Sequence, residues 1–191
     1  MKEIVQEGAE VLNQVAEPIP DELFGSKKLN QLIEEMAKAL DQQIEGVALA
    51  APQVGVPYRL FIVRVDRTLP PPSLNTQGST LAQNSQGQTL QAPEPKPEIE
   101  VYINPEIIKT SQKKVEVDEG CLSVRGVYGV TKRHEKVTIR ARRIDGSTFQ
   151  RGGSGLLAQI FEHETDHLNG VLFVEHAKRL VEVVHTHEPT I

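Results

Sequence analysis

The sequence contains a single cysteine, Cys121, and no tryptophan. One thiol cannot form an intramolecular disulfide, so a reducing compartment is the natural expectation and the fold must depend on a hydrophobic core. A chain of 191 residues is long enough to bury such a core within one domain. Cys121 is therefore either a small buried hydrophobic residue or a residue with a chemical role.

An excess of positive charge and long apolar runs are also missing. The formal net charge of -5 argues against a dedicated nucleic-acid binder, so no DNA partner is expected. The apolar runs fall well short of the roughly 20 residues that span a membrane, and residues 1–10 lack the apolar segment of a signal peptide. We therefore expect a soluble protein with no membrane partner.

The spacing of apolar residues predicts a first helix and the strand that follows it. The helical repeat begins after Ser26, a candidate N-cap, and Gly46 is expected to end it. The apolar positions of this helix are Leu29, Leu32, Ile33, Met36 and Leu40. Small residues and proline at 46–55 predict a close-packed turn, which leads into a strand at 60–65.

Strand patterns return after residue 100 and are followed by a second helix. The predicted strands cover residues 101–103, 114–117, 127–130 and 136–142. A helix is expected over 154–168, with Ser154 as its N-cap and Gly170 as its end. This order of elements predicts an α+β fold in which mostly antiparallel sheets pack around a central helix.

Residues 67–98 differ abruptly in composition, being rich in Pro, Gln, Ser, Asn and Gly. Such a segment lacks the apolar residues that could pack against a core. We therefore interpret it as a flexible surface insertion within one domain that spans residues 1–191, and we assign no chemistry to it.

Residues 163–167 read His-Glu-Thr-Asp-His and lie within the second predicted helix. Residues four apart share a helix face, so His163 and His167 can bind one metal ion. Glu164 is rotated away from that ion and can take a proton from a water. Leu156 and Ile160 extend the same stripe, which predicts that it is buried. Two buried imidazoles without a metal would leave Glu164 without a role, so the pattern predicts a metal site.

A helix supplies only two ligands comfortably, so a third must come from elsewhere. One group of zinc proteases places a further histidine six residues after the second, with a glycine between. Gly170 matches that glycine, but Phe173 occupies the histidine position and cannot coordinate a metal. Glu175 and Glu182 are candidates for a carboxylate ligand, although no local pattern supports either.

Cys121 does have a supporting local pattern, in the segment Glu119-Gly120-Cys121-Leu122-Ser123. Glycine allows the backbone to bend tightly there and leaves amide groups free to face a ligand. A thiolate from this segment would complete a site with two histidines and one cysteine, and a fourth position would stay open for water.

Three segments together resemble one known family, the peptide deformylases. They read GVALAAPQVG at 46–55, EGCLS at 119–123 and HETDHLNG at 163–170, in that order. The resemblance extends from about Ile4 to Phe173, apart from the insertion. It implies a hydrolase that removes the formyl group from the N-terminal methionine of newly made polypeptides.

The resemblance also implies a cofactor and a mechanism. One Fe²⁺ ion per chain, replaceable by Zn²⁺, Ni²⁺ or Co²⁺, would be held by Cys121, His163 and His167. A metal lowers the pKa of its water, and Glu164 would take the proton as hydroxide attacks the formyl carbon, then protonate the departing amine. The implied partners are N-formyl-methionyl nascent peptides and, transiently, the ribosome. The implied location is a bacterial-type cytoplasm, or an organelle if a transit peptide had been removed.

Further site residues follow from the matching family positions. The Gln53 side chain and the Leu122 backbone N–H would stabilise the oxyanion. A bound peptide would add a strand along the main chain of Val47–Leu49, next to Gly120. An apolar pocket for the methionine is implied near Val47, Leu122, Leu156 and Ile160. Arg133 and Asp166 would form an ion pair that braces the metal-binding helix, although these residues and the apolar ones could equally be structural.

The chain departs from the family pattern at three positions. Ala48 stands where glycine is usual, Arg125 where proline is usual, and Glu162 where glutamine is common. None of these changes removes a ligand or the general base. We therefore expect them to affect substrate fit more than activity.

Two other interpretations remain open. A zinc peptidase would use the same helix with a different third ligand, so its metal binding would survive replacement of Cys121 by alanine. A non-catalytic peptide-binding relative would hold a structural metal with four protein ligands and no exchangeable water.

Overall fold

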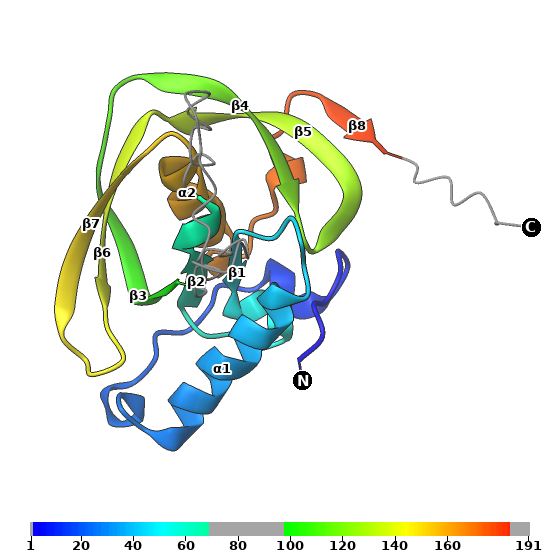
Figure 1. Cartoon of the computed structure of the whole chain (residues 1–191). Coiled ribbons are helices and arrows are strands. Elements are labelled where there is room, and N and C mark those ends of the chain that lie inside the picture. Colours follow the sequence, from blue (N-terminus) through cyan, green and yellow to red (C-terminus); the bar gives the residue numbers. More distant parts are fainter. Residues whose placement is uncertain (1, 69–97, 184–191) are drawn as a thin grey trace, which may run out of the picture.

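The computed structural model describes residues 2–68 and 98–183 (Figure 1). Of the insertion predicted at 67–98, only Arg67, Thr68 and Glu98 belong to this part, and the rest lies outside the described residues. Within the described ranges, no helix has the length and apolar character needed to cross a bilayer.

Residues 2–68 and 98–183 form two antiparallel sheets and two α-helices. The larger sheet has the strand order β1-β2-β3-β6-β7, with β1 Ala48–Ala50, β2 Leu60–Arg64, β3 Ile99–Thr110, β6 Lys136–Arg142 and β7 Thr148–Ser154. The smaller sheet has the order β4-β5-β8, with β4 Lys114–Cys121, β5 Val124–His134 and β8 Leu180–Glu182. The helices are α1 Lys27–Asp41 and α2 Leu156–Leu168. Short 3₁₀ turns occupy Glu10–Asn13, Asp21–Leu23, Ala51–Val54, Val65–Arg67 and Phe173–Glu175.

Helix α2 lies in the middle of the molecule, and the strands of both sheets curve around it (Figure 1). This arrangement confirms the predicted α+β fold. All five residues of β2 are buried, because the strand has a helix on each face. Phe61 and Val63 belong to a core cluster with residues of α2, whereas Leu60 and Ile62 belong to a cluster with residues of α1.

Helix α1 begins as predicted, because the Ser26 hydroxyl accepts a hydrogen bond from the Leu29 N–H at 3.2 Å. Its end was predicted wrongly. The helix stops at Asp41, five residues before Gly46. The segment 46–55, expected to be a turn throughout, instead contains β1 and the 3₁₀ turn Ala51–Val54. Small residues at these positions let β1 pack tightly between β2 and α2, a tertiary contact that no local pattern predicts.

Helix α2 begins differently from the prediction. Ser154 is the last residue of β7, and the N-cap is Gly155, whose φ of 56° lies in the left-handed region that favours glycine. Strand β7 had not been predicted, since Gly152 and Gly153 weaken its pattern. Leu156, expected on the buried stripe, is 43% exposed because it belongs to the first turn of the helix. The end of α2 before Gly170 is confirmed.

Candidate metal centre and active site

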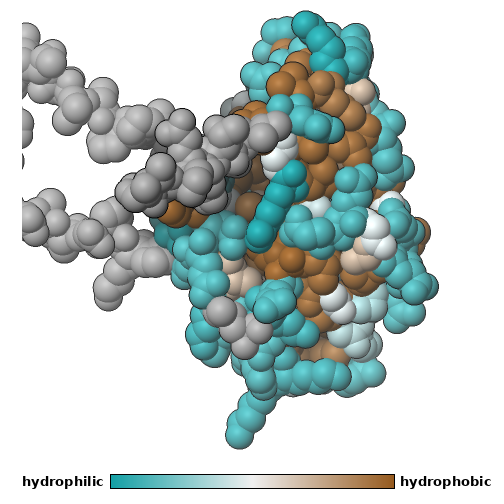
Figure 2. All heavy atoms as spheres, turned by 90° about the vertical axis from the view of Figure 1, so that its right-hand side faces the viewer, coloured by the Kyte–Doolittle hydropathy of each residue, from teal (hydrophilic) through white to brown (hydrophobic). Residues whose placement is uncertain are grey.

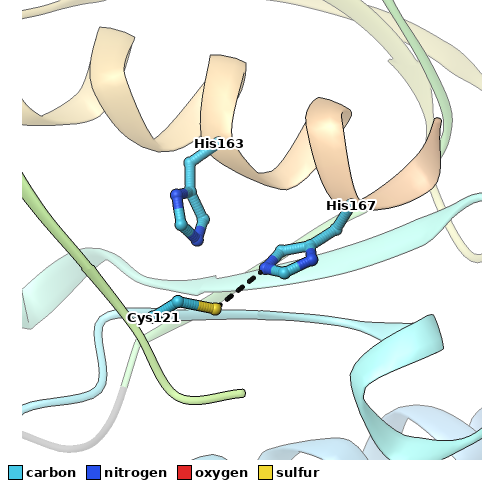
Figure 3. Close-up of side chains that lie close together, drawn as sticks. All are labelled: Cys121, His163 and His167. Atoms are coloured by element: carbon cyan, nitrogen blue, oxygen red, sulfur yellow. Dashed lines mark hydrogen bonds between the residues drawn. The ribbon is translucent and has the colours of Figure 1, made fainter. Parts of the chain in front are cut away.

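Three potential metal ligands converge between α2 and the end of β4. His163 and His167 project from adjacent turns of α2 toward Cys121 (Figure 3). The Cys121 Sγ lies 3.2 Å from the His167 Nε2, and one ligand atom from each of the three residues lies within 4.8 Å of the others. The convergence predicted from sequence is therefore present, although Cys121 and the histidines are more than 40 residues apart.

The turn between β4 and β5 fixes the position of Cys121. A register irregularity between Gly120 and Cys121 brings Cys121 opposite Val124, so the strands are joined by a very short connection. The Ser123 N–H and the Gln53 Nε2 both point to the sulfur, at 3.4 and 3.5 Å. These two donors help to hold the sulfur at the end of β4, beside the histidines.

Glu119 orients His163, a role that the sequence analysis missed. The His163 Nδ1 forms a hydrogen bond with Glu119 Oε1, so Nε2 is the ring nitrogen that could bind a metal. Burial alone would raise the pKa of Glu119, but hydrogen bonds from His163 and Arg133 outweigh it and hold this pKa well below its usual range. The only available signal was the place of Glu119 at the start of the EGCLS segment.

Arg133 joins Glu119 to the metal-binding helix. Its Nη2 and Nε donate to the two carboxylate oxygens of Glu119 at 2.6 and 3.0 Å, and its Nη1 lies 2.6 Å from Asp166 Oδ2. The side chains of Arg133 and Glu119 are 6% and 2% exposed. The pair expected from Arg133 and Asp166 is thus part of a larger buried network that runs from β5 through β4 to α2.

Glu164 has a free proton acceptor next to the ligand cluster. It is 3% exposed, and within the described part of the chain its Oε2 has no hydrogen-bond partner. Burial raises the pKa of Glu164 to about 7, and the nearby charges of Glu119 and Asp166 add to the shift. A carboxylate with such a pKa exchanges protons readily near neutral pH. Burial also lowers the pKa of His167, which keeps that imidazole neutral, as a metal ligand must be.

Glu162, which stands where glutamine is common in the family, has His134 as its hydrogen-bond partner. Its carboxylate accepts a hydrogen bond from the His134 N–H at 2.7 Å, and its other oxygen lies 2.6 Å from the His134 Nδ1. Glu162 therefore ties α2 to β5 and is directed away from the ligand cluster.

The oxygen and the nitrogen of the Gln53 side-chain amide have different hydrogen-bond partners. Its Oε1 accepts from the Ala50 N–H at 2.8 Å, which caps the local turn. Its Nε2 donates to Ser123 Oγ at 3.2 Å and is the group that faces Cys121. Capping of the local turn and a role in the site are thus compatible in one side chain.

A cavity of about 810 Å³ opens onto the ligand cluster. Its walls contain most of the predicted site residues, namely Val47, Ala48, Gln53, Gly120, Cys121, Leu122, Leu156, Ile160, His163 and Glu164. Leu49 is not among the lining residues, because its side chain is fully buried in the cluster that contacts α1. The volume falls within the range of about 300–1,000 Å³ that is usual for ligand sites.

The donor set fits a transition metal. One thiolate and two imidazoles are ligands that iron and zinc accept, and the buried Glu164 oxygen without a partner belongs to the same cavity. The other candidate ligands lie elsewhere. Glu175 Oε1 accepts from the Leu172 N–H at 2.6 Å, and Glu182 belongs to β8, paired with Val127.

Comparison with known proteins places this site in a family. A sequence model described as polypeptide deformylase matches residues 1–183. The chain belongs to the polypeptide deformylase family. It is 37% identical over 175 residues to the peptide deformylase of Halothermothrix orenii, with 92% of each chain covered. It is 35% identical over 175 residues to the chloroplastic peptide deformylase 1A of Solanum lycopersicum, with 92% of this chain and 59% of that protein covered.

Solved deformylase structures share the fold. A peptide deformylase from Legionella pneumophila is similar with a TM-score of 0.71 and 34% identity, over 93% of this chain and 86% of that one. A Met-Ala-Ser-bound class I type b peptide deformylase from Acinetobacter baumannii gives a TM-score of 0.71 and 31% identity, over 91% and 96% of the two chains.

Membership of this family identifies the chain as a hydrolase that removes the formyl group from newly made polypeptides. Deformylases depend on a metal, and the cluster of Cys121, His163 and His167 could hold it. The prediction of the family and of its activity from three short segments is confirmed.

Proposed function

We propose that Glu164 is the general base and then the general acid of formyl hydrolysis in this chain. The proposal rests on its buried, unpaired Oε2, which lies in the cavity wall beside His163. With a pKa of about 7, the carboxylate can take a proton from the attacking water and return it to the departing amine.

The metal in this proposal is one Fe²⁺ ion per chain, held by Cys121, His163 and His167, with Zn²⁺, Ni²⁺ or Co²⁺ able to replace it. A ligand set of thiolate and imidazole suits iron and zinc alike. A bound divalent cation would lower the pKa of a water and polarise the formyl oxygen. Glu119 and Arg133 would hold His163 in the tautomer that directs Nε2 to the ion, and Asp166 would brace Arg133 from α2.

Negative charge on the formyl oxygen would be stabilised by the Gln53 Nε2 and the Leu122 backbone N–H. Gln53 supports this role because its Oε1 is fixed by Ala50, which orients the Nε2 toward Cys121. Removing one such donor typically lowers the rate about 10²- to 10³-fold.

The substrate would bind as an added strand beside β1. This strand is at the edge of the larger sheet, and the described strands flank it only on the β2 side. Main-chain groups of Val47–Leu49 would pair with the peptide, and Gly120 would line the opposite side. The methionine side chain would occupy the apolar wall formed by Val47, Leu122, Leu156 and Ile160. Ala48 adds a methyl group to this wall where glycine is usual.

The substrates would be nascent chains, so the proposed place of action is near a ribosome with transient contact. This corresponds to a bacterial-type cytoplasm or to an organelle that translates in the same way. The chloroplastic name of the tomato relative supports the organelle alternative.

The test is anaerobic hydrolysis of formyl-Met-Ala-Ser together with measurement of bound metal. We expect Glu164→Ala and the isosteric Glu164→Gln to keep the metal and lose about 10²- to 10⁴-fold in kcat. Glu162→Gln is the matched control, because it alters the adjacent carboxylate outside the site and should keep both metal and turnover. Wild-type rates in the Glu164 variants would overturn the assignment. Metal retention in Cys121→Ala would instead indicate a different third ligand.

A further inference from the structure

A β-turn at Gln43–Gly46 forms part of the cavity wall. The Gly46 N–H donates to the Gln43 carbonyl at 3.1 Å, and all four residues of the turn line the cavity. Ile44 stands at the tip and is 92% exposed. A single exposed aliphatic side chain needs no explanation by itself. Ile44 differs from other exposed aliphatic residues because hydrogen bonds at both ends of its turn fix its position.

Arg67 fixes both ends of the turn. Its Nη1 donates to the Gln43 carbonyl at 2.8 Å and to the Gly46 carbonyl at 2.6 Å. The charge of the guanidinium strengthens both bonds. Asp41, at the end of α1, lies 3.9 Å from the Arg67 Nη2 and also pairs with Arg64. The turn is therefore anchored to the end of α1 and to the chain after β2.

The turn is also packed against the proposed catalytic segment. Gly46 is buried, and a Cβ at this position would lie 2.8 Å from Leu40 Cδ1 and 3.2 Å from Leu122 Cδ1. Gly46 leads directly into Val47 and Ala48. The position of Ile44 is thus set relative to the segment along which a peptide would bind.

The smaller sheet contributes an aromatic residue to the same cavity. Tyr128 pairs with Gly120 across β4 and β5, and its ring covers Gly120, since a Cβ there would lie 2.8 Å from the ring. Tyr128 is 42% exposed and lines the cavity with Ile44. On the face of the molecule that carries β8, apolar patches extend from the top to the bottom of the view, with polar side chains between and around them (Figure 2).

A peptide that enters this cavity continues beyond its first residue. An extended chain advances about 3.3 Å per residue, so a strand laid along β1 from the metal ligands soon passes the turn that precedes β1. The cavity is larger than one side chain requires, and Ile44 and Tyr128 are among the residues that line it.

We propose that Ile44 contacts the residues that follow the formyl-methionine and favours apolar side chains there, and that Arg67 is the positioning residue that holds Ile44 in place. This inference rests on the proposed function, because it assumes that the peptide lies along β1. It adds a substrate preference, for nascent chains with apolar second and third residues, and a role for a residue outside the three family segments.

The first experiment compares formyl-Met-Leu-Leu with formyl-Met-Asn-Asn, whose side chains are similar in size and uncharged. For the metal-loaded wild type we expect the Leu peptide to have the higher kcat/KM. Ile44→Ser should lower the Leu/Asn ratio of kcat/KM about 3- to 10-fold. Val15→Ser is the matched control, because Val15 is 69% exposed and does not line the cavity. An unchanged ratio in Ile44→Ser would overturn the proposal.

The second experiment tests Arg67. Arg67→Met should raise KM for the Leu peptide with little change in kcat, because it frees a binding surface and touches no reacting atom. It should also lower the Leu/Asn ratio, which a general loss of stability would not do. Arg140→Met is the control, since Arg140 pairs with Glu106 at the surface. Equal losses of kcat/KM for both peptides would indicate that Arg67 has only a structural role and would contradict the proposal.

Failure of this inference can be separated from failure of the proposed function. If the wild type hydrolysed neither peptide, the proposed function would be wrong. Binding of Met-Leu-Leu and Met-Asn-Asn to wild type and Ile44→Ser, measured by calorimetry, would then decide the inference alone. A preference for Met-Leu-Leu that Ile44→Ser removes would support it, and equal binding of the two peptides to the wild type would refute it.

Discussion

The Glu119 carboxylate accepts a hydrogen bond from the His163 ring and a bidentate pair of hydrogen bonds from Arg133. Glu119 lies two residues before Cys121 on β4, whereas His163 is on α2. One buried carboxylate therefore connects the strand that carries Cys121 with the helix that carries the two histidines. The relative position of these two elements determines whether the ligand atoms converge.

Replacing Glu119 should weaken metal binding more than any other change outside the ligands. In Glu119→Ala, His163 loses the partner that fixes its tautomer, and Arg133 becomes a buried charge with only Asp166 nearby. Loss of such an outer partner typically lowers metal affinity about 10- to 100-fold. Competition with a chelator measures the change, and Glu106→Ala, at an exposed ion pair, serves as the control. Wild-type affinity in Glu119→Ala would show that the helix alone orients His163.

The pair of Arg64 and Asp66 should make stability depend on pH in the acid range. Hydrogen bonds from Arg64 at 2.8 and 2.9 Å, together with the Glu98 N–H, hold the pKa of Asp66 below its usual value. The contribution of Asp66 to stability is then complete above its unfolded pKa of about 3.9 and is lost as the pH falls through the folded pKa.

The substitution Asp66→Asn tests the direction in which the stability contribution of Asp66 changes with pH. At pH 7 the variant should have a lower free energy of unfolding than the wild type, and the difference should shrink as the pH falls below about 4. Urea unfolding at pH 7, 5 and 3.5 measures both chains. A difference that stays constant across these values would mean that the charge of Asp66 does not stabilise the fold.

Shortening the segment 69–97 should leave the fold and the turnover intact. Its flanks already meet, because the Val65 N–H donates to the Glu98 carbonyl at 2.9 Å and Asp66 Oδ1 accepts from the Glu98 N–H at 3.2 Å. Each halving of a loop changes its closure cost by only about 0.6 kcal/mol. A variant with a short Gly-Ser linker after Thr68, assayed on formyl-Met-Ala-Ser and by thermal unfolding, tests this. Loss of turnover with an unchanged melting temperature would assign the segment a role in catalysis.

The secondary structure could be predicted where the signal was local. The cap at Ser26, the repeat of α1, the histidine spacing of α2 and the stop at Gly170 all depend on residues within a few positions of one another, and the structure has each of them. Strand β1 and strand β7 could not be predicted in this way. Their residues are small or glycine, and they become strands because β2 and β6 pair with them.

The same distinction between local signals and long-range contacts applies to the residues of the site. Cys121, His163, His167 and Glu164 could be named from sequence because each sits in a short segment whose residue types carry the chemistry. The contacts between those segments could not be predicted from the sequence. Glu119 holds His163 through a contact across 44 positions, and Arg67 holds the turn at Ile44 from more than 20 positions away.

The sequence by itself therefore determined the candidate ligands, the proposed general base and, through the resemblance of three short segments to a known family, the reaction class, because each of these depends on residues that lie close together in the chain. Only the tertiary structure decided which carboxylate contacts His163, that the two ends of Gln53 contact its own turn and Cys121, and which residues line the cavity. Those outcomes depend on how two sheets curve around α2, and burial and hydrogen bonding between distant segments set that curvature.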